Sequence, residues 1–304
     1  MRLAPLFTPS CAADSNRLPP SGLPFKTVNM IYIFPDSGEF SPTVAQNRAR
    51  KMREILSVAL DLAVEGGLDN LTLHGLAERM GRSVAAVYRY YPSKEAVVRE
   101  LQRLVATHIG VLNADTADRI DGWAREKALS EQDLALARII GAAQTYELFA
   151  VASPAEFGLV THYLGNPANV LSEQDVRMVF DVTRGSLQRL ADLIADAEAK
   201  GVLDKGDARE RALMIWGALQ GAIQLLKVTR RGAAWGEAGG LPDATVRTLL
   251  LGWGADGARL GMIAGKVRTM QLAAPQRQVR DLLNTMTTKR RNRRPTKQMH
   301  PEGG

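Results

Sequence analysis

The sequence is poor in the residues that build disulfides and metal sites. It has one cysteine and four histidines in 304 residues. A single cysteine, Cys11, cannot form an intramolecular disulfide or supply a thiolate cluster. No histidines occur at the HExxH spacing of a zinc site or at a similar spacing. We therefore expect no metal site and no cofactor in this protein.

Long apolar runs are also missing. No uninterrupted apolar stretch approaches the roughly 18 residues that a membrane-spanning helix needs. The stretch from Met1 to Phe7 is apolar only briefly and is interrupted by Pro5, which does not match a signal peptide. These absences predict a cytoplasmic protein with no membrane partner.

No arrangement typical of an active site is present either. Acidic residues such as Glu126, Glu131 and Asp192 are expected on polar faces of helices. No serine lies in the pattern of a nucleophile elbow, and no nucleophile–base pair or carboxylate pair is indicated. We therefore do not expect an enzyme.

Positive charge is present in excess and is unevenly distributed. The net charge is +7, and residues 289–297 alone carry six cations and no acid, which leaves 7 − 6 = +1 for the rest. A second cluster, Arg48, Arg50, Lys51 and Arg53, falls within six residues. Clustered cations indicate a polyanionic partner. For the tail alone, the alternative is a disordered segment that only keeps the protein soluble.

Hydrophobic periodicity divides the chain into four parts. Residues 1–42 are rich in proline and lack a sustained period, which predicts a disordered leader. Residues 43–110 and 111–284 both show apolar residues at the three- and four-residue steps of helices. The second of these parts is interrupted near residues 165–167, 201–206 and 232–242. Residues 285–304 form a basic, disordered tail. No alternating strand pattern occurs, so the predicted fold class is all-α.

The segment from Thr72 to Tyr91 carries the pattern of a helix-turn-helix. Thr72 can cap the first short helix and Ser83 the second, because their hydroxyls accept hydrogen bonds from free N–H groups. Gly81 between them permits a turn that a side chain would penalise. Two short helices joined by a glycine turn can place the second helix in a major groove of DNA.

Residues 48–105 resemble the DNA-binding domain of the TetR family of bacterial transcriptional regulators. The resemblance rests on a set of small, capping and aromatic residues: Gly67, Thr72, Ala77, Gly81, Ser83, Val87, Tyr88, Tyr90, Tyr91, Pro92, Ser93, Lys94 and Glu95. It implies a homodimer that places paired domains in successive major grooves of double-stranded DNA. It also implies a C-terminal helical domain, at residues 111–284, that binds a small-molecule effector and forms the dimer.

The resemblance assigns roles within the helix-turn-helix. Positions that match the family imply phosphate contacts for Thr72, Tyr88, Tyr90 and Lys94, with core packing as the alternative for Tyr90. The Arg48 cluster is also placed to meet phosphates. Base contacts are expected from Ser83, Val84, Ala85 and Ala86, of which the last three can mainly touch thymine methyl groups. Arg82 departs from the small apolar residue usual in the family and is expected to reach a phosphate, and Tyr91 is expected in the core.

The second half offers weaker candidates. The expected effector-binding residues are Tyr146, Phe149, Phe157, His162 and Phe180, with Tyr163, Met178 and Met214 as further candidates, although aromatic residues at helical spacing also form ordinary cores. The expected dimer helices span residues 206–230 and 242–264. Their interface residues are Trp216, Gly217, Gly221, Trp253, Gly257 and Gly261, with Leu219, Ile223 and Leu249 adding buried area. Alternatively, the glycines only weaken these helices.

Together these features predict a ligand-responsive repressor that binds a palindromic operator as a homodimer. The alternative is a helical adaptor that binds another protein and has no sequence-specific affinity for DNA. The two differ in one measurable property, because binding to duplex DNA weakens steeply with salt.

Overall fold

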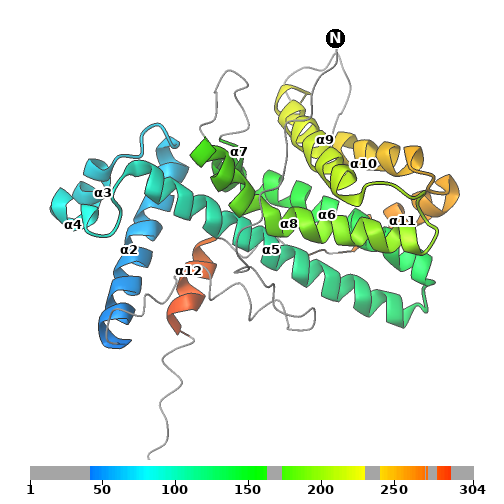
Figure 1. Cartoon of the computed structure of the whole chain (residues 1–304), viewed down its shortest axis with the longest axis horizontal. Helices are drawn as coiled ribbons and strands as arrows, with labels where there is room; N and C mark the ends of the chain where they lie inside the picture. The colour runs from blue at the N-terminus through cyan, green and yellow to red at the C-terminus, as the bar shows by residue number, and fades with distance from the viewer. Residues whose placement is uncertain (1–41, 163–172, 230–239, 271, 273–278, 289–304) are drawn as a thin grey trace, which may run out of the picture.

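The computed structural model describes residues 42–162, 173–229, 240–270, 272 and 279–288. The predicted leader at residues 1–41, the basic tail from residue 289, and the side chains of Tyr163, Met178 and Phe180 lie outside this description. Every regular element within these residues is an α-helix, which confirms the all-α fold class. Figure 1 shows a smaller N-terminal domain at one end and a larger helical bundle at the other.

The N-terminal domain is built from α2 (Pro42–Gly66), α3 (Leu73–Arg79), α4 (Val84–Tyr88) and the start of α5 (Lys94–Glu126). One face of α2 contributes Ile55, Leu56 and Ala59 to a core in which each is at most 2% exposed. The hydroxyls of Thr72 and Ser83 accept the N–H groups of Gly75 and Ala86, as the capping pattern predicts. Gly81 adopts a φ of 61° between α3 and α4, a region that penalises residues with a Cβ.

Helix α5 runs without interruption from the N-terminal domain into the bundle. The expected domain boundary at residues 110/111 falls inside this helix of 33 residues. No glycine turn or proline breaks the segment, and its buried residues continue through Leu112, Thr116 and Ile120. A continuous helix therefore connects the two ends of the molecule (Figure 1).

The bundle packs α6 (Glu131–Ala152) against α5, α8 (Glu173–Ala199), α9 (Ala208–Thr229), α10 (Leu241–Gly252) and α11 (Gly257–Thr269). The short α7 (Pro154–Thr161) lies against α5 and α6. Helix α6 is long and apolar enough to cross a membrane, but 61% of its most apolar window is buried inside the protein. Its side chains Leu136 and Ile139 are fully buried in the bundle core. The burial of α6 is that of a core helix.

The segment expected as one dimer helix over residues 242–264 is two helices. Helix α10 ends at Gly252 and α11 begins at Gly257. Gly254 has a φ of 93°, and a Cβ there would lie 2.6 Å from the carboxylate of Asp204. The Asp256 side chain then accepts the Arg259 N–H and caps α11. The glycine pattern at Gly257 and Gly261 therefore belongs to α11 alone.

A final helix, α12 (Val279–Thr288), returns to the N-terminal domain and contacts α2 and α5. Val279 is fully buried and Leu283 is 4% exposed in the N-terminal core. Arg280 pairs with Asp61 of α2. The helix ends at Thr288, so it includes the first four residues of the basic tail expected from residue 285.

Candidate functional site

The helix-turn-helix presents α4 on the outside of the N-terminal domain. Val87 is fully buried and fastens α4 to the core, while Ser83 and Ala85 are exposed. Val84 and Ala86 are half-buried, and Val84 packs against the core. The surface available for base contacts is therefore small and largely apolar, which suits contact with thymine methyl groups.

The two tyrosines expected at phosphates occupy different environments. Tyr88 is 53% exposed. Tyr90 is half-buried, and the guanidinium groups of Arg48 and Arg89 lie 5.5 and 6.0 Å from the centre of its ring. Arg48 also donates a hydrogen bond to the Arg89 carbonyl, at 3.4 Å. These contacts bring the N-terminal half of α2 next to the end of α4 and gather cations around one aromatic ring.

Tyr91 packs in the core, as expected. It is 2% exposed, and its hydroxyl donates to the Met52 carbonyl at 3.5 Å. Burial, together with the nearby charge of Glu100, raises the pKa of Tyr91 well above its usual value. This side chain holds the end of α4 against α2.

Arg82 is exposed and forms an ion pair on the surface of the domain. Its guanidinium pairs with Glu54 of α2 at 3.4 Å, and Lys51 contacts the same carboxylate at 2.9 Å. The hydrogen bond from Lys51, followed by the charges of Lys51 and Arg82, lowers the pKa of Glu54, against an opposing effect of burial. Without DNA, the Glu54 carboxylate is therefore the partner of Arg82, and the expected contact of Arg82 with a phosphate stays a prediction.

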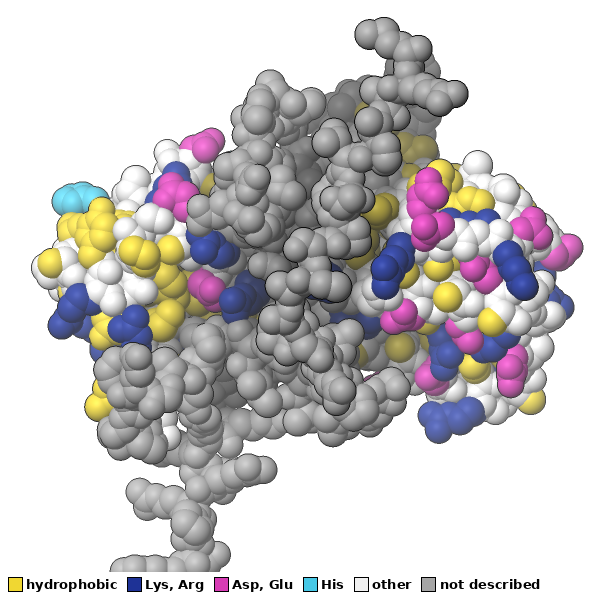
Figure 2. All heavy atoms as spheres, viewed as in Figure 1, with side chains coloured by type: hydrophobic (Ala, Val, Ile, Leu, Met, Phe, Trp, Pro, Cys, Tyr) yellow, Lys and Arg dark blue, Asp and Glu magenta, His cyan; other side chains and the backbone are white. Residues whose placement is uncertain are grey.

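Lys94 is the first residue of α5, directly after Ser93, whose hydroxyl accepts the Ala96 N–H. Its ammonium group donates to the Asp69 carbonyl at 3.3 Å. Thr72 is exposed at the start of α3. Two helix N-termini, where N–H groups attract anions, thus lie on the same domain as the Arg48 cluster. Figure 2 shows Lys and Arg side chains on the edge of this domain.

The bundle encloses a cavity of about 490 Å³ between α5, α6, α8 and α9. Tyr146 is half-buried in its wall, and the Tyr146 hydroxyl accepts a hydrogen bond from the Trp216 ring nitrogen at 3.2 Å. Burial raises the pKa of Tyr146 far above its usual value, and this hydrogen bond opposes the shift. The wall is mainly apolar, with Ile109 and Leu219 among its residues.

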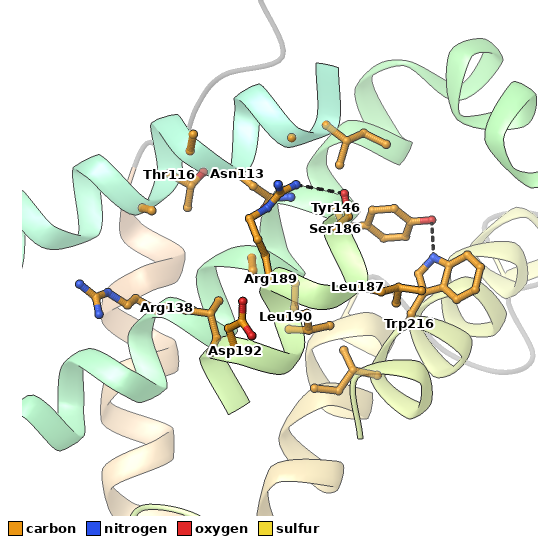
Figure 3. A pocket seen from close by; sticks show the side chains of 18 of the residues that line it. Asn113, Thr116, Arg138, Tyr146, Ser186, Leu187, Arg189, Leu190, Asp192 and Trp216 are labelled. Atoms are coloured by element: carbon orange, nitrogen blue, oxygen red, sulfur yellow. Dashed lines mark hydrogen bonds between the residues drawn. The ribbon is translucent and has the colours of Figure 1, made fainter. Parts of the chain in front are cut away.

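Polar groups enter this cavity from α5 and α8 (Figure 3). Arg189 donates to the Ser186 hydroxyl at 3.2 Å. Burial lowers the pKa of Arg189 to about 10, against an opposing effect of Asp192. Asn113 also lines the cavity, and no described residue donates a hydrogen bond to its buried Oδ1 atom. A ligand with one donor and one acceptor group could therefore find partners in an otherwise apolar space.

Most of the expected effector residues lie elsewhere. Phe149 and Phe157 are 1% and 4% exposed in the N-terminal core, where their rings stack edge-on with each other. His162 is exposed at the end of α7, and Met214 is exposed on α9. Only Tyr146 of the described candidates lines the cavity. Aromatic residues at helical spacing predicted burial here but could not distinguish a core from a cavity wall.

Helix α9 has an exposed face of apolar and small residues. Leu213, Met214 and Leu225 are 47%, 47% and 52% exposed, and Gly217 and Gly221 are exposed between them. The steps of three and four residues place all five on one side of the helix. This face contains the expected interface residues Gly217 and Gly221.

The other expected interface residues point into their own chain. The Trp216 ring nitrogen donates a hydrogen bond to the Tyr146 hydroxyl. Leu219 and Ile223 are 4% and 6% exposed and pack in the hydrophobic cores of the chain. Trp253 lies beneath the Arg211 guanidinium, 5.0 Å from its ring. Half-buried Leu249 packs against the bundle core. Leu219 and Ile223 are thus buried within their own chain, whereas Trp216, Leu249 and Trp253 are half-buried, and their part in an interface stays a prediction.

Gly257 and Gly261 lie on α11. A Cβ at Gly257 would come 3.5 Å from Leu251, and one at Gly261 would come 3.9 Å from Arg247. Both neighbours belong to α10, so these glycines border a helix of the same chain. Among the described residues, no group of three His, Cys, Asp or Glu side chains could hold a metal ion.

An exposed helix-turn-helix joined by one helix to a bundle that encloses a cavity defines a DNA-binding regulator. Residues 55–101 match the family model of bacterial regulatory proteins, tetR family. This match covers the helix-turn-helix and the start of α5. The N-terminal domain of this chain is therefore similar to the DNA-binding domains of that family.

Related proteins extend over more of the chain. An uncharacterized HTH-type transcriptional regulator of Mycobacterium bovis is 28% identical over 183 residues, which are 60% of this chain and 85% of the relative. A TetR-family transcriptional regulator from Agrobacterium tumefaciens is similar in structure, with a TM-score of 0.46 and 21% identity over 68% of this chain and 98% of its own. A protein of unknown function from Rhodococcus sp. RHA1 has a TM-score of 0.46 and 24% identity over 66% and 95%.

Proposed function

We propose that this regulator is a ligand-responsive repressor that binds a palindromic operator as a homodimer. The observation that carries the proposal is the continuity of α5, whose first residue lies beside the helix-turn-helix and whose middle forms the wall of the cavity. A ligand in the cavity contacts the same helix that supports the DNA-binding surface. Such a ligand changes DNA affinity if it binds one arrangement of the domains more tightly than the other.

We propose DNA contacts in two groups. Ser83, Ala85 and the exposed parts of Val84 and Ala86 face the bases. Thr72, Tyr88, Tyr90, Arg48 and Lys94 face the phosphates. Phosphate contacts supply affinity and register, whereas base contacts supply sequence preference. Arg82 pairs with Glu54, and its contact with a phosphate stays a prediction.

The test of DNA binding compares two lysines at the opposite ends of α5. Lys94→Ala should weaken binding to every duplex alike and should lower the slope of log affinity against log salt by about one. Lys127→Ala, just past the other end of α5, is the matched control and should change neither quantity. Fluorescence anisotropy with duplex fragments from upstream of the coding region measures both.

Equal affinities and slopes for Lys94→Ala and the unchanged protein would contradict this docking arrangement. A full-length protein that binds no duplex at any salt concentration would instead favour the adaptor alternative. Circular dichroism of both variants verifies that the helices remain folded, since Lys94 also donates to the Asp69 carbonyl.

Because the bundle contains this cavity, we propose that the effector is a small molecule. Its volume of about 490 Å³ lies in the range of small-molecule sites. The apolar probe N-phenyl-1-naphthylamine should bind with one site per chain and become fluorescent. Ala142→Phe, which adds a ring to the cavity wall, should abolish this signal, whereas Val151→Phe on an exposed part of α6 should not. Equal probe binding by both variants would place the site outside this cavity.

A further inference from the structure

Arg189 places a positive charge inside the cavity of the bundle. It lies on α8, is half-buried, and donates a hydrogen bond to the Ser186 hydroxyl at 3.2 Å. Figure 3 shows the guanidinium end of its side chain inside the cavity, reaching from α8 toward Asn113 on α5. Burial lowers the pKa of Arg189 only to about 10, so the group stays protonated at neutral pH. The cavity therefore contains a cation under physiological conditions.

The other charged side chains of the cavity wall pair with each other or lie at the surface. Arg138 of α6 pairs with Asp121 of α5 at 2.9 Å. Asp118 and Asp192 are exposed. In Figure 3 the Asp192 carboxylate points away from the guanidinium end of Arg189. Of the charged side chains that the structure describes in this wall, Arg189 is thus the one that brings its charge to the interior.

The neighbouring groups compensate the burial of this charge only in part. Desolvation outweighs the attraction of Asp192 in its effect on the pKa of Arg189, and the Asp192 carboxylate also accepts the Gln188 amide at 2.9 Å. The Ser186 hydroxyl is a neutral acceptor, which holds a guanidinium less strongly than a carboxylate does. A carboxylate that enters the cavity can accept two parallel hydrogen bonds from the guanidinium and so complete the compensation.

The surroundings of Arg189 define the remainder of a suitable ligand. Ile109, Ala143 and Leu219 belong to a mainly apolar wall, and burial of an apolar molecule against such a wall is favourable. The Asn113 Oδ1 atom is buried, and no described residue donates a hydrogen bond to it. The cavity therefore suits a molecule with an apolar body and a polar end near Arg189 and Asn113.

We infer that the effector is an organic acid, an apolar molecule with one carboxylate, and that Arg189 binds this carboxylate. Asn113 accepts a hydrogen bond from a donor on the same ligand. The inference rests on the proposed ligand-responsive function, to which it adds the chemical class of the ligand and the residue that selects it. Because Arg189 forms charge-assisted hydrogen bonds only with an acceptor that carries charge, it discriminates an acid from the corresponding neutral amide.

The experiment compares two ligands that differ in charge but little in size. Naphthalene-1-acetate and its neutral amide, naphthalene-1-acetamide, compete with the fluorescent probe N-phenyl-1-naphthylamine for the full-length protein. The acid should bind about tenfold or more tightly than the amide, because hydrogen bonds between charged groups are stronger than those between neutral groups. Titration of the displaced fluorescence gives both affinities.

Variants of α8 assign the preference to one side chain. Arg189→Gln should remove the preference for the acid and leave the affinities of the amide and of the neutral probe unchanged. Arg189→Lys keeps the charge but not the planar fork, so it should retain part of the preference. Arg184→Gln removes the same charge from an exposed position of α8 and should behave like the unchanged protein.

Three results would overturn the inference. The first is equal affinity of the unchanged protein for acid and amide. The second is a loss in Arg189→Gln that acid, amide and neutral probe share, because it would show that Arg189 only maintains the shape of the cavity. The third is an equal loss of acid affinity in Arg184→Gln, because it would reflect the net charge of the protein.

Duplex affinity separates this inference from the function on which it rests. If the acid binds through Arg189 but leaves the affinity for duplex DNA unchanged, the ligand class stands and the proposed ligand response fails. If the acid and the amide lower duplex affinity equally, and do so in the Arg189→Gln protein as well, the proposed function stands and the inference fails.

Discussion

Two acidic side chains face each other where α6 meets α10. Glu147 lies near Asp243, which also pairs with Arg268 and, at 3.9 Å, with Arg247. Burial raises the pKa of Glu147, the charge of Asp243 raises it further, and Arg268 opposes the shift. The ionised form of Glu147 is therefore less favourable in the folded protein than in the unfolded chain.

This arrangement predicts that Glu147→Gln increases the stability of the folded protein in a pH-dependent way. An acid whose pKa in the folded protein lies above its unfolded value of about 4.5 lowers stability as the pH rises from the unfolded pKa to the folded pKa. At neutral pH the amide should therefore raise the melting temperature, and below pH 4.5 the difference should disappear. Thermal unfolding followed by circular dichroism at the two pH values measures this.

Glu126→Gln is the control for this prediction. The hydrogen bond and charge of Lys127 lower the pKa of Glu126, which is fully exposed, so its amide should give no gain at neutral pH. A Glu147→Gln protein that melts below the unchanged protein at neutral pH would contradict the assignment of a strained carboxylate.

Helix α9 contributes side chains to two different surfaces, the cavity wall and an exposed outer face. Its inner side carries Trp216 and Leu219 toward the cavity, while its outer face exposes Leu213, Met214 and Leu225. A contiguous exposed apolar face on a monomer marks an interaction site. We propose that two copies of this face meet about a two-fold axis, with Gly217 and Gly221 allowing the helices to approach closely.

Leu213→Glu should therefore produce monomers, because it places a charge within an apolar contact. Analytical ultracentrifugation should show half the molecular mass of the unchanged protein, and binding to a palindromic duplex should weaken. Val64→Glu, on an equally exposed part of α2, should leave the assembly unchanged. A Leu213→Glu protein that still sediments as a dimer would place the interface on another face.

At the scale of the whole molecule, α12 couples the end of the described chain to its beginning. Leu283 is 4% exposed in the N-terminal core. Truncation of a buried leucine costs about 2–5 kcal/mol through lost burial and the remaining cavity. Leu283→Ala should lower the free energy of unfolding by this amount, measured by urea denaturation.

Val151→Ala is the reference for that measurement. Its side chain is 45% exposed, and exposed substitutions usually change stability by no more than about 0.5 kcal/mol. If Leu283→Ala were equally mild, α12 would contribute little to the stability of the N-terminal domain.

The sequence predicted the helix-turn-helix well because its signals are local. The hydroxyls of Thr72 and Ser83 cap helices within three residues, and Gly81 makes its own turn. The cavity could not be predicted in this way, because Asn113 and Arg189 are distant in the sequence and meet only after the bundle packs. In the sequence, Arg189 stands close to Leu187 and Leu190. This pattern does not distinguish an arginine at a cavity from one on a solvated helix face.

Errors in the sequence prediction have a common physical origin. Periodicity identifies the apolar side of a helix but not the element that covers it, so Leu219 and Ile223 were assigned to a partner chain although they pack within their own. Periodicity also did not show that α5 continues as one helix across residues 110/111, because a helix that passes between two domains keeps the same period on both sides.

Helix α5 is long, so a small tilt at one end produces a large displacement at the other end. From Thr116 at the cavity to Lys94 beside the helix-turn-helix the helix rises about 33 Å, so a tilt of about 5° at the cavity moves its other end by about 3 Å. In the proposed two-fold dimer both ends move, and the separation of the two recognition helices changes by up to twice that amount. Successive major grooves on one face of DNA lie about 34–36 Å apart, so in that dimer a small tilt at the cavity alters the spacing on which operator binding depends.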